Sequence, residues 1–97
     1  MEKVKLQAQY GLYINGQWRN ASDGATYNAE SPADGSHLAV CAQGSREDVE
    51  AASAAAWEAF KTWKKTTPAQ RAALLNKIAD IIDANKEHLA MVESMDN

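Results

Sequence analysis

The sequence predicts an α+β fragment, in which a short antiparallel β-meander is followed by a helical hairpin. Turn signals and β-forming residues are concentrated in residues 1–43, whereas apolar residues recur at helical spacing from residue 45 onward. The supply of large apolar residues is small, because 19 of the 97 residues are Ala and 15 are Leu, Ile, Val or Phe. A chain of this size and composition is expected to need a further surface to complete its core.

The first expected element is a β-hairpin centred on Asn15-Gly16. Leu12, Tyr13 and Ile14 precede this dipeptide, and Gln17-Trp18 follows it. Asn-Gly between two short extended segments is a strong hairpin signal, because both residues accept the positive φ angles of a type I′ turn.

Two further turns divide the rest of the β-region. Residues 22–24 (Ser-Asp-Gly) precede a candidate strand over 25–29, and residues 31–35 (Ser-Pro-Ala-Asp-Gly) precede a second one over 38–42. Proline presets φ in such turns, and glycine takes the left-handed position. The expected result is a meander of three short strands.

The first helix is expected over residues 45–64. Ser45 followed by Asp48 resembles a capping box, although Glu or Gln is the usual partner. Acidic and basic residues occupy the opposite face of this helix, so it is amphipathic with one apolar stripe that we expect to be buried. That stripe is rich in alanine and consists of Val49, Ala52, Ala56, Phe60 and Trp63.

The second helix is expected over residues 67–97. Thr67, Pro68 and Gln70 form a favourable helix start. Asn85 interrupts the apolar stripe, so we expect a break near residues 83–86. No glycine, proline or charged tail ends the segment, which suggests that the chain is cut off there. The stripe consists of Leu74, Leu75, Ile78, Ile81, Ile82, Leu89 and Val92.

Charge and composition exclude several classes of function. Ten basic and 13 acidic residues give a net charge of −3, which argues against binding to a nucleic-acid backbone. No apolar run is long enough to span a membrane, and Met1 to Leu6 lacks the pattern of a signal peptide. The single cysteine cannot form an internal disulfide. We therefore expect a cytoplasmic protein that binds neither nucleic acid nor membrane.

The residues with reactive side chains do not form a catalytic or metal-binding pattern. Cys41 lies in an expected strand among small apolar residues, whereas a nucleophilic cysteine needs an electropositive, partly exposed position. His37 and His88 are far apart and have no further ligand at metal-binding spacing. The residues themselves thus predict no catalytic and no metal site.

The remaining candidates also have structural explanations. Glu47, Asp48 and Glu50 stand at an expected helix start, where carboxylates complement the helix dipole. The five glycines form no phosphate-binding motif, so no cofactor-binding residue is predicted. Three tryptophans could stack on nucleobases, but no basic groove accompanies them, and packing in a core or interface explains them better. They are Trp18, Trp57 and Trp63.

The order of these segments resembles the aldehyde dehydrogenase superfamily. Leu12–Trp18 is similar to its opening apolar-Ile-Asn-Gly-x-Trp strand. The turn over 30–35 is similar to its Asn-Pro-Ala-Thr-Gly turn, with Ser31 in place of Asn and Asp34 in place of Thr. The resemblance covers residues from about 12 to 97 and extends to acetaldehyde-type members. Further similar segments are 41–49, 51–63, 67–75, 78–82 and 93–97.

The resemblance implies that residues 1–97 are the N-terminal part of the NAD(P)-binding domain of the α/β aldehyde dehydrogenase fold. It implies a homo-oligomeric parent that oxidises an aldehyde to a carboxylic acid with NAD or NADP. A cysteine would form a thiohemiacetal, hydride would pass to the nicotinamide, and a glutamate-activated water would release the acid. The catalytic domain is absent from this segment, and the family's catalytic cysteine and glutamate lie beyond position 97.

For this chain alone, the resemblance implies neither activity nor a bound cofactor, and Cys41 inherits no catalytic role. Some family members bind a monovalent cation through backbone carbonyls that would correspond to Ala29 and Glu30. The helices would pack on the rest of the domain, so the stripe of the second helix would be exposed in isolation. Such a chain would tend to associate.

Two alternatives stay open. The chain could be a truncated, non-catalytic paralogue whose apolar helix face binds a partner as a protein-interaction module. It could equally be a proteolytic or engineered fragment. The sequence does not decide which aldehyde or which of the two dinucleotides the parent would use.

Overall fold

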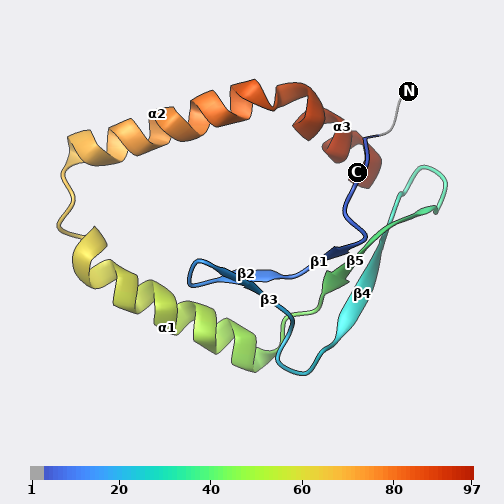
Figure 1. Cartoon of the computed structure of the whole chain (residues 1–97), viewed down its shortest axis with the longest axis horizontal. Coiled ribbons are helices and arrows are strands. Elements are labelled where there is room, and N and C mark those ends of the chain that lie inside the picture. The colour runs from blue at the N-terminus through green and yellow to red at the C-terminus, as the bar shows by residue number, and fades with distance from the viewer. Residues whose placement is uncertain (1–3) are drawn as a thin grey trace.

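The computed structural model of the protein describes residues 4–97 (Figure 1). Met1–Lys3, which belong to the segment tested for a signal peptide, lie outside the described residues. Short strands come first and helices follow, which confirms the predicted fold class. The strands are β1 (Gln9–Tyr10), β2 (Leu12–Ile14), β3 (Gln17–Arg19), β4 (Thr26–Glu30) and β5 (His37–Ala42). The helices are α1 (Arg46–Trp63), α2 (Pro68–Ala84) and α3 (Lys86–Asp96).

The strands form two small sheets. Strands β2 and β3 pair as the predicted antiparallel hairpin, with Tyr13 opposite Trp18. Asn15 and Gly16 have φ angles of 54° and 75°, so both central residues of the turn take the positive φ of type I′. The second sheet has the order β1-β5-β4.

The second sheet differs from the expected antiparallel meander. Strands β4 and β5 are antiparallel as predicted, but β1 pairs parallel to β5, with Gln9 opposite Val40. A parallel pair needs a long connection, and the hairpin together with β4 provides it. The expectation of one continuous meander is therefore wrong. The β1 segment has no turn signal or long apolar alternation that would have revealed it.

The helix starts agree closely with their sequence signals. Ser45 and Asp48 form a complete capping box at α1, and Thr67 and Gln70 form another at α2. Asn85 separates α2 from α3, inside the range where a break is predicted. Its side-chain Nδ2 donates to the carbonyl of Ile81 at 2.9 Å, so the asparagine takes up a carbonyl at the end of α2.

The elements are arranged as an open, flat frame that measures 48 × 36 × 17 Å. Figure 1 shows α1 and α2 diverging from their connection at residues 64–67, with the β2–β3 hairpin between them. Arg71 fastens this connection, because its Nη2 donates to the Trp63 carbonyl at 3.1 Å and its Nε donates to Thr66 Oγ1 at 2.8 Å. The two helices are thus consecutive and joined by a short connection, as in a helical hairpin, but they diverge and do not pack along their lengths.

Little of the chain is buried. Among residues 4–97, the buried residues are Ala21, Ala39, Ser31 and Asp48. Val49 and Phe60 in α1 are 62% and 47% exposed, so the expectation that the α1 stripe is buried is wrong for this chain. Ile78 in α2 is 52% exposed, which confirms that the second stripe is uncovered. In the part of the chain that the structure describes, no helix is long and apolar enough to cross a membrane.

Candidate functional site

The most strongly connected polar group in the described residues is the carboxylate of Asp48, in the first turn of α1. Its side chain is 2% exposed. Arg19 Nη2 donates to Asp48 Oδ1 at 2.8 Å, and the Ser22 backbone N–H donates to Oδ2 at 3.1 Å. The Ser45 backbone N–H and hydroxyl each donate to Oδ2 at 2.9 Å. We call Arg19, Ser22, Ser45 and Asp48 the Asp48 clasp.

The clasp favours the ionised form of Asp48. Hydrogen bonds from the Ser45 and Ser22 backbone amides hold the pKa of this carboxyl well below its ordinary value of 3.8. The Ser45 hydroxyl and Arg19 act in the same direction, and desolvation opposes them. A carboxylate held in this way is a poor proton acceptor near neutral pH. The geometry therefore assigns Asp48 a structural role and not one in acid–base catalysis.

The sequence indicates only part of this arrangement. The capping interaction of Ser45 with Asp48 is predicted from their spacing, and the structure confirms it. Arg19 and Ser22 are missed, because they lie 29 and 26 residues from Asp48 and no local pattern links them. Glu47 and Glu50 do not join the clasp among the interactions described. Glu50 instead accepts from Arg46 at 3.2 Å on the exposed side of α1.

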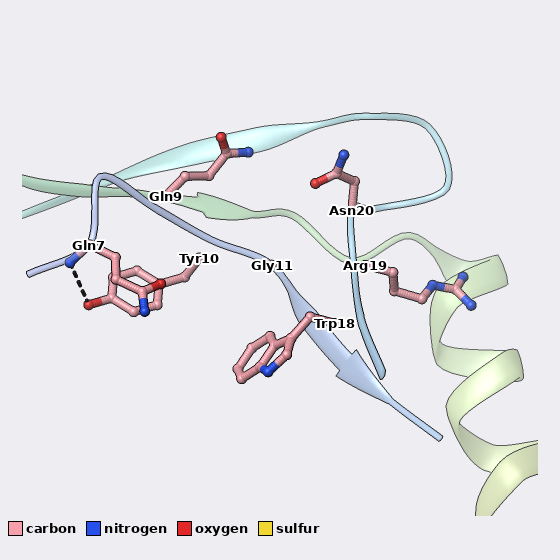
Figure 2. Close-up of a pocket in the computed structure, with 7 residues that line it drawn as sticks. All are labelled: Gln7, Gln9, Tyr10, Gly11, Trp18, Arg19 and Asn20. Atoms are coloured by element: carbon pink, nitrogen blue, oxygen red, sulfur yellow. Dashed lines mark hydrogen bonds between the residues drawn. The ribbon is translucent and has the colours of Figure 1, made fainter. Parts of the chain in front are cut away.

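A hollow of about 600 Å³ lies between β1 and the end of β3, beside Gly11. Figure 2 shows the side chains around it. Gln9 and Asn20 project to one side of the strands, Tyr10 and Trp18 to the other, and Arg19 points away toward α1. A ligand site needs polar groups that converge on one volume. These groups diverge, so the hollow does not have the arrangement of a small-molecule site.

Two residues that line this hollow, Gly11 and Arg19, make a close backbone contact. A Cβ atom at Gly11 would stand 2.7 Å from the carbonyl oxygen of Arg19. Glycine is required here because no side chain fits between the start of β2 and the end of β3. Gly11 thereby lets the chain pass from one sheet to the other while Arg19 stays in reach of Asp48.

Cys41 lies within β5, where it is partly buried, and faces Tyr27 across the β4–β5 pair. A side-chain hydrogen bond with Cys41 raises the pKa of the Tyr27 phenol. The cysteine is in mid-strand and not at a helix N-terminus, the position that activates many catalytic thiols. The structure thus places Cys41 inside the β4–β5 pair, and the absence of a catalytic role stays a prediction.

The two histidines are not brought together. His37 begins β5 opposite Glu30, whereas His88 lies in α3, and both side chains are exposed. Within residues 4–97, no three His, Cys, Asp or Glu side chains are placed to hold a metal ion. Strand β4 has a register shift between Ala29 and Glu30. Cation binding by their carbonyls stays a prediction.

The tryptophans lie on the surface of this chain. Trp57 and Trp18 are 71% and 69% exposed. Trp18 contacts Tyr13 with ring centroids 4.9 Å apart, and Trp57 meets Phe60 edge to face at 5.9 Å. Aromatic residues that are mutually packed but uncovered suit an interface with further protein surface better than a nucleic-acid groove.

Residues 18–97 match the aldehyde dehydrogenase family. A long-chain-aldehyde dehydrogenase from an Acinetobacter species is 41% identical over 98% of this chain and 19% of its own length. The NAD+ complex of an aldehyde dehydrogenase from Bacillus cereus is similar with a TM-score of 0.87 and 38% identity, over 92% of this chain and 18% of the other. PnpE, solved with nicotinamide adenine dinucleotide, has a TM-score of 0.86 and 41% identity, over 90% and 18%.

This chain therefore spans about a fifth of the length of the relatives that it matches. The structural agreement covers nine-tenths or more of this chain in both of these structures. On this evidence, the chain belongs to the aldehyde dehydrogenase family.

Proposed function

We propose that the chain is the N-terminal portion of an NAD(P)-dependent aldehyde dehydrogenase whose full-length form oxidises an aldehyde to a carboxylic acid. The observation that carries the proposal is the family match over residues 18–97. A TM-score of 0.87 with a relative solved with NAD+ supports the choice of a nicotinamide cofactor. The cofactor would accept a hydride from the substrate, and a cysteine outside this segment would form the thiohemiacetal.

The contribution of these 97 residues would be structural. Helices α1 and α2 carry apolar residues that are about half exposed in this chain, including Phe60, Ile78 and Ile82. In a longer polypeptide, these faces would pack against the rest of the cofactor-binding domain, and their burial would stabilise both parts. The parent's homo-oligomeric state and cytoplasmic location belong to the same proposal.

The chain alone would not oxidise aldehydes. Cys41 is its single thiol, and it lies in mid-strand opposite Tyr27 and not at a helix N-terminus, the position that activates many catalytic thiols. The experiment is to incubate the purified chain with NAD or NADP and a panel of aldehydes and to follow NAD(P)H formation. We expect none. Turnover that disappears in a Cys41→Ser variant would contradict the proposal.

A chimera tests the role in the parent. Residues 1–97 replace the matching segment of the Bacillus cereus aldehyde dehydrogenase, and aldehyde-dependent NADH formation is measured. We expect a folded enzyme with activity, and we expect the Cys41→Ser variant of the chimera to keep that activity. A chimera that folds as judged by circular dichroism and gel filtration but forms no NADH would contradict the assignment.

The second candidate function is that of a non-catalytic interaction module, and the exposed α2 stripe favours it. Sedimentation velocity of the chain over a range of concentrations separates the two. A defined oligomer of fixed stoichiometry would favour the module. Polydisperse association that grows with concentration would favour a segment that lacks the rest of its domain.

A further inference from the structure

The Asp48 clasp is built entirely from residues 19–48. Its donors come from the end of β3 (Arg19), the following turn (Ser22) and the N-cap of α1 (Ser45). The hydroxyls of Ser22 and Ser45 also lie 2.6 Å apart and connect two of these donors to each other. A buried carboxylate is stable when its lone pairs are occupied, and here the protein supplies these partners itself.

Apolar packing and a close backbone approach surround the clasp. Ala21, between Arg19 and Ser22, is 6% exposed. Gly11 lies against the Arg19 carbonyl, and a Cβ at Gly44 would stand 3.9 Å from Leu12 Cδ2. The start of β2 thus contacts both the end of β3 and the residue before the N-cap of α1, next to the segments that donate to Asp48. The relative position of these segments is specified by the hydrogen bonds to Asp48 as well as by van der Waals contact.

Helix α2 has no comparable link to the strands among the interactions that the structure describes. Its capping box and its Asn85 bond lie within the helix and its ends, and its large apolar residues are about half exposed. Apolar contact is non-directional and stabilises a position only when a partner surface is present. The hairpin is therefore positioned by directional polar bonds, whereas α2 depends on apolar contact with a partner surface.

We propose that the Asp48 clasp is a conformational device that fixes the β2–β3 hairpin on the N-terminus of α1 independently of α2, so that this unit keeps its geometry while the apolar helix faces are uncovered. The unit is then a preorganised platform, and α2 is the part whose order depends on packing against further protein surface. The inference concerns contacts inside this chain and does not depend on the reaction that a longer protein performs.

Backbone amide hydrogen exchange of the 97-residue chain, followed by NMR, tests this proposal. The amides of Ser22 and Ser45 donate to Asp48 and report directly on the clasp. We expect them to exchange at least about tenfold more slowly than amides in the middle of α2, because the two regions open separately. Equal exchange in both regions would overturn the proposal.

The decisive variant is Asp48→Asn, which keeps the shape of the side chain but replaces one acceptor oxygen by a donor. The matched control is Glu47→Gln, which removes the same charge one residue earlier at an exposed position. We expect Asp48→Asn to accelerate exchange at Ser22 and Ser45 about tenfold or more and to leave α2 unchanged. The control should change neither region.

Two outcomes would contradict the proposal. Equal effects of Asp48→Asn and Glu47→Gln would show that charge at the helix start matters and the clasp does not. Loss of protection throughout α2 in Asp48→Asn would show one cooperative unit without a separate platform.

Arg19→Lys provides a graded test, since it keeps the charge but loses the planar guanidinium. It should accelerate exchange at Ser22 and Ser45 less than Asp48→Asn does.

Discussion

The region around Asp48 is linked to other chain segments by polar bonds, whereas the apolar face of helix α2 is exposed. Around Asp48, polar groups from three chain segments meet within hydrogen-bonding distance of one carboxylate that is 2% exposed. In α2, the apolar residues of a 17-residue helix have no such set of partners, and Leu75 is 67% exposed. One part of this chain thus has its geometry fixed by polar bonds, while the main apolar surface of another part still lacks a partner.

The largest effect is expected where the uncovered stripe becomes buried. In the chimera with the Bacillus cereus enzyme, Ile78→Asp should destabilise the protein by about 3 kcal/mol or more, because it buries an unpaired charge. In the 97-residue chain, the same substitution should change stability by less than about 0.5 kcal/mol, since Ile78 is 52% exposed. Thermal unfolding of both proteins measures the difference.

The control for that substitution is Asn76→Asp, which introduces the same charge two residues earlier at an exposed polar position of α2. It should be nearly neutral in both contexts. If Ile78→Asp were equally tolerated in the chimera, the apolar stripe of α2 would not be a packing surface, and the interaction-module alternative would gain support.

The next effect is the loss of the contribution of Asp48 to stability at low pH. The pKa of Asp48 is lowered in the folded chain, so its contribution to stability is complete at pH values above its ordinary pKa of 3.8 and is lost as the pH falls below that value. Asp48→Asn should remove this component. Exchange at Ser22 and Ser45, measured from pH 6 down to about pH 2.5, checks the direction.

Other charged groups near the clasp define the control for the acid experiment. Arg46, Glu47 and Glu50 lie on the same helix end, and Asp23 lies in the preceding turn, where its Oδ1 accepts from Ala25 N–H at 3.0 Å. Glu47→Gln should retain the acid dependence at Ser22 and Ser45. An acid transition that is identical in Asp48→Asn would assign the titration to one of these neighbours.

A smaller effect is expected at the backbone contact below the clasp. Gly11→Ala should destabilise the chain by about 1–3 kcal/mol, because the new Cβ would stand 2.7 Å from the Arg19 carbonyl oxygen. Gly44→Ala serves as the comparison, since its Cβ would make an ordinary contact at 3.9 Å. Chemical denaturation of the two variants should rank Gly11→Ala as clearly the less stable.

The smallest effect is expected on the exposed side of α1. Lys61 Nζ lies 2.8 Å from Glu58 Oε2, but the two side chains are 70% and 75% exposed. Lys61→Ala should therefore change stability by less than about 0.5 kcal/mol. A loss comparable to that of Gly11→Ala would show that surface ion pairs contribute more to this fold than the clasp comparison implies.

Local sequence signals account for much of the secondary structure. Asn15-Gly16 specifies its turn because both residues tolerate positive φ, and Ser45, Thr67 and Asn85 mark helix boundaries through side chains that bond nearby backbone groups. These interactions span a few residues, so their partners can be identified in a linear sequence. The family resemblance was likewise contained in the order of such segments.

Long-range pairings could not be predicted in the same way. The parallel partnership of β1 with β5 joins residues about thirty positions apart, and β1 is too short to carry a pattern of its own. The bond between Arg19 and Asp48 is equally distant in sequence. In the hollow next to β1, the side chains seen in Figure 2 diverge, which is a matter of strand orientation and not of residue type.

The turns, the helix starts and the break at Asn85 follow from the sequence alone, because each depends on neighbours within a few residues. The tertiary structure decided which strands pair, which carboxylate among Glu47, Asp48 and Glu50 is buried, and which apolar faces stay exposed. Burial depends on what else occupies the space around a side chain. Helical spacing of apolar residues identifies an apolar face, but only the folded arrangement determines whether a partner covers that face.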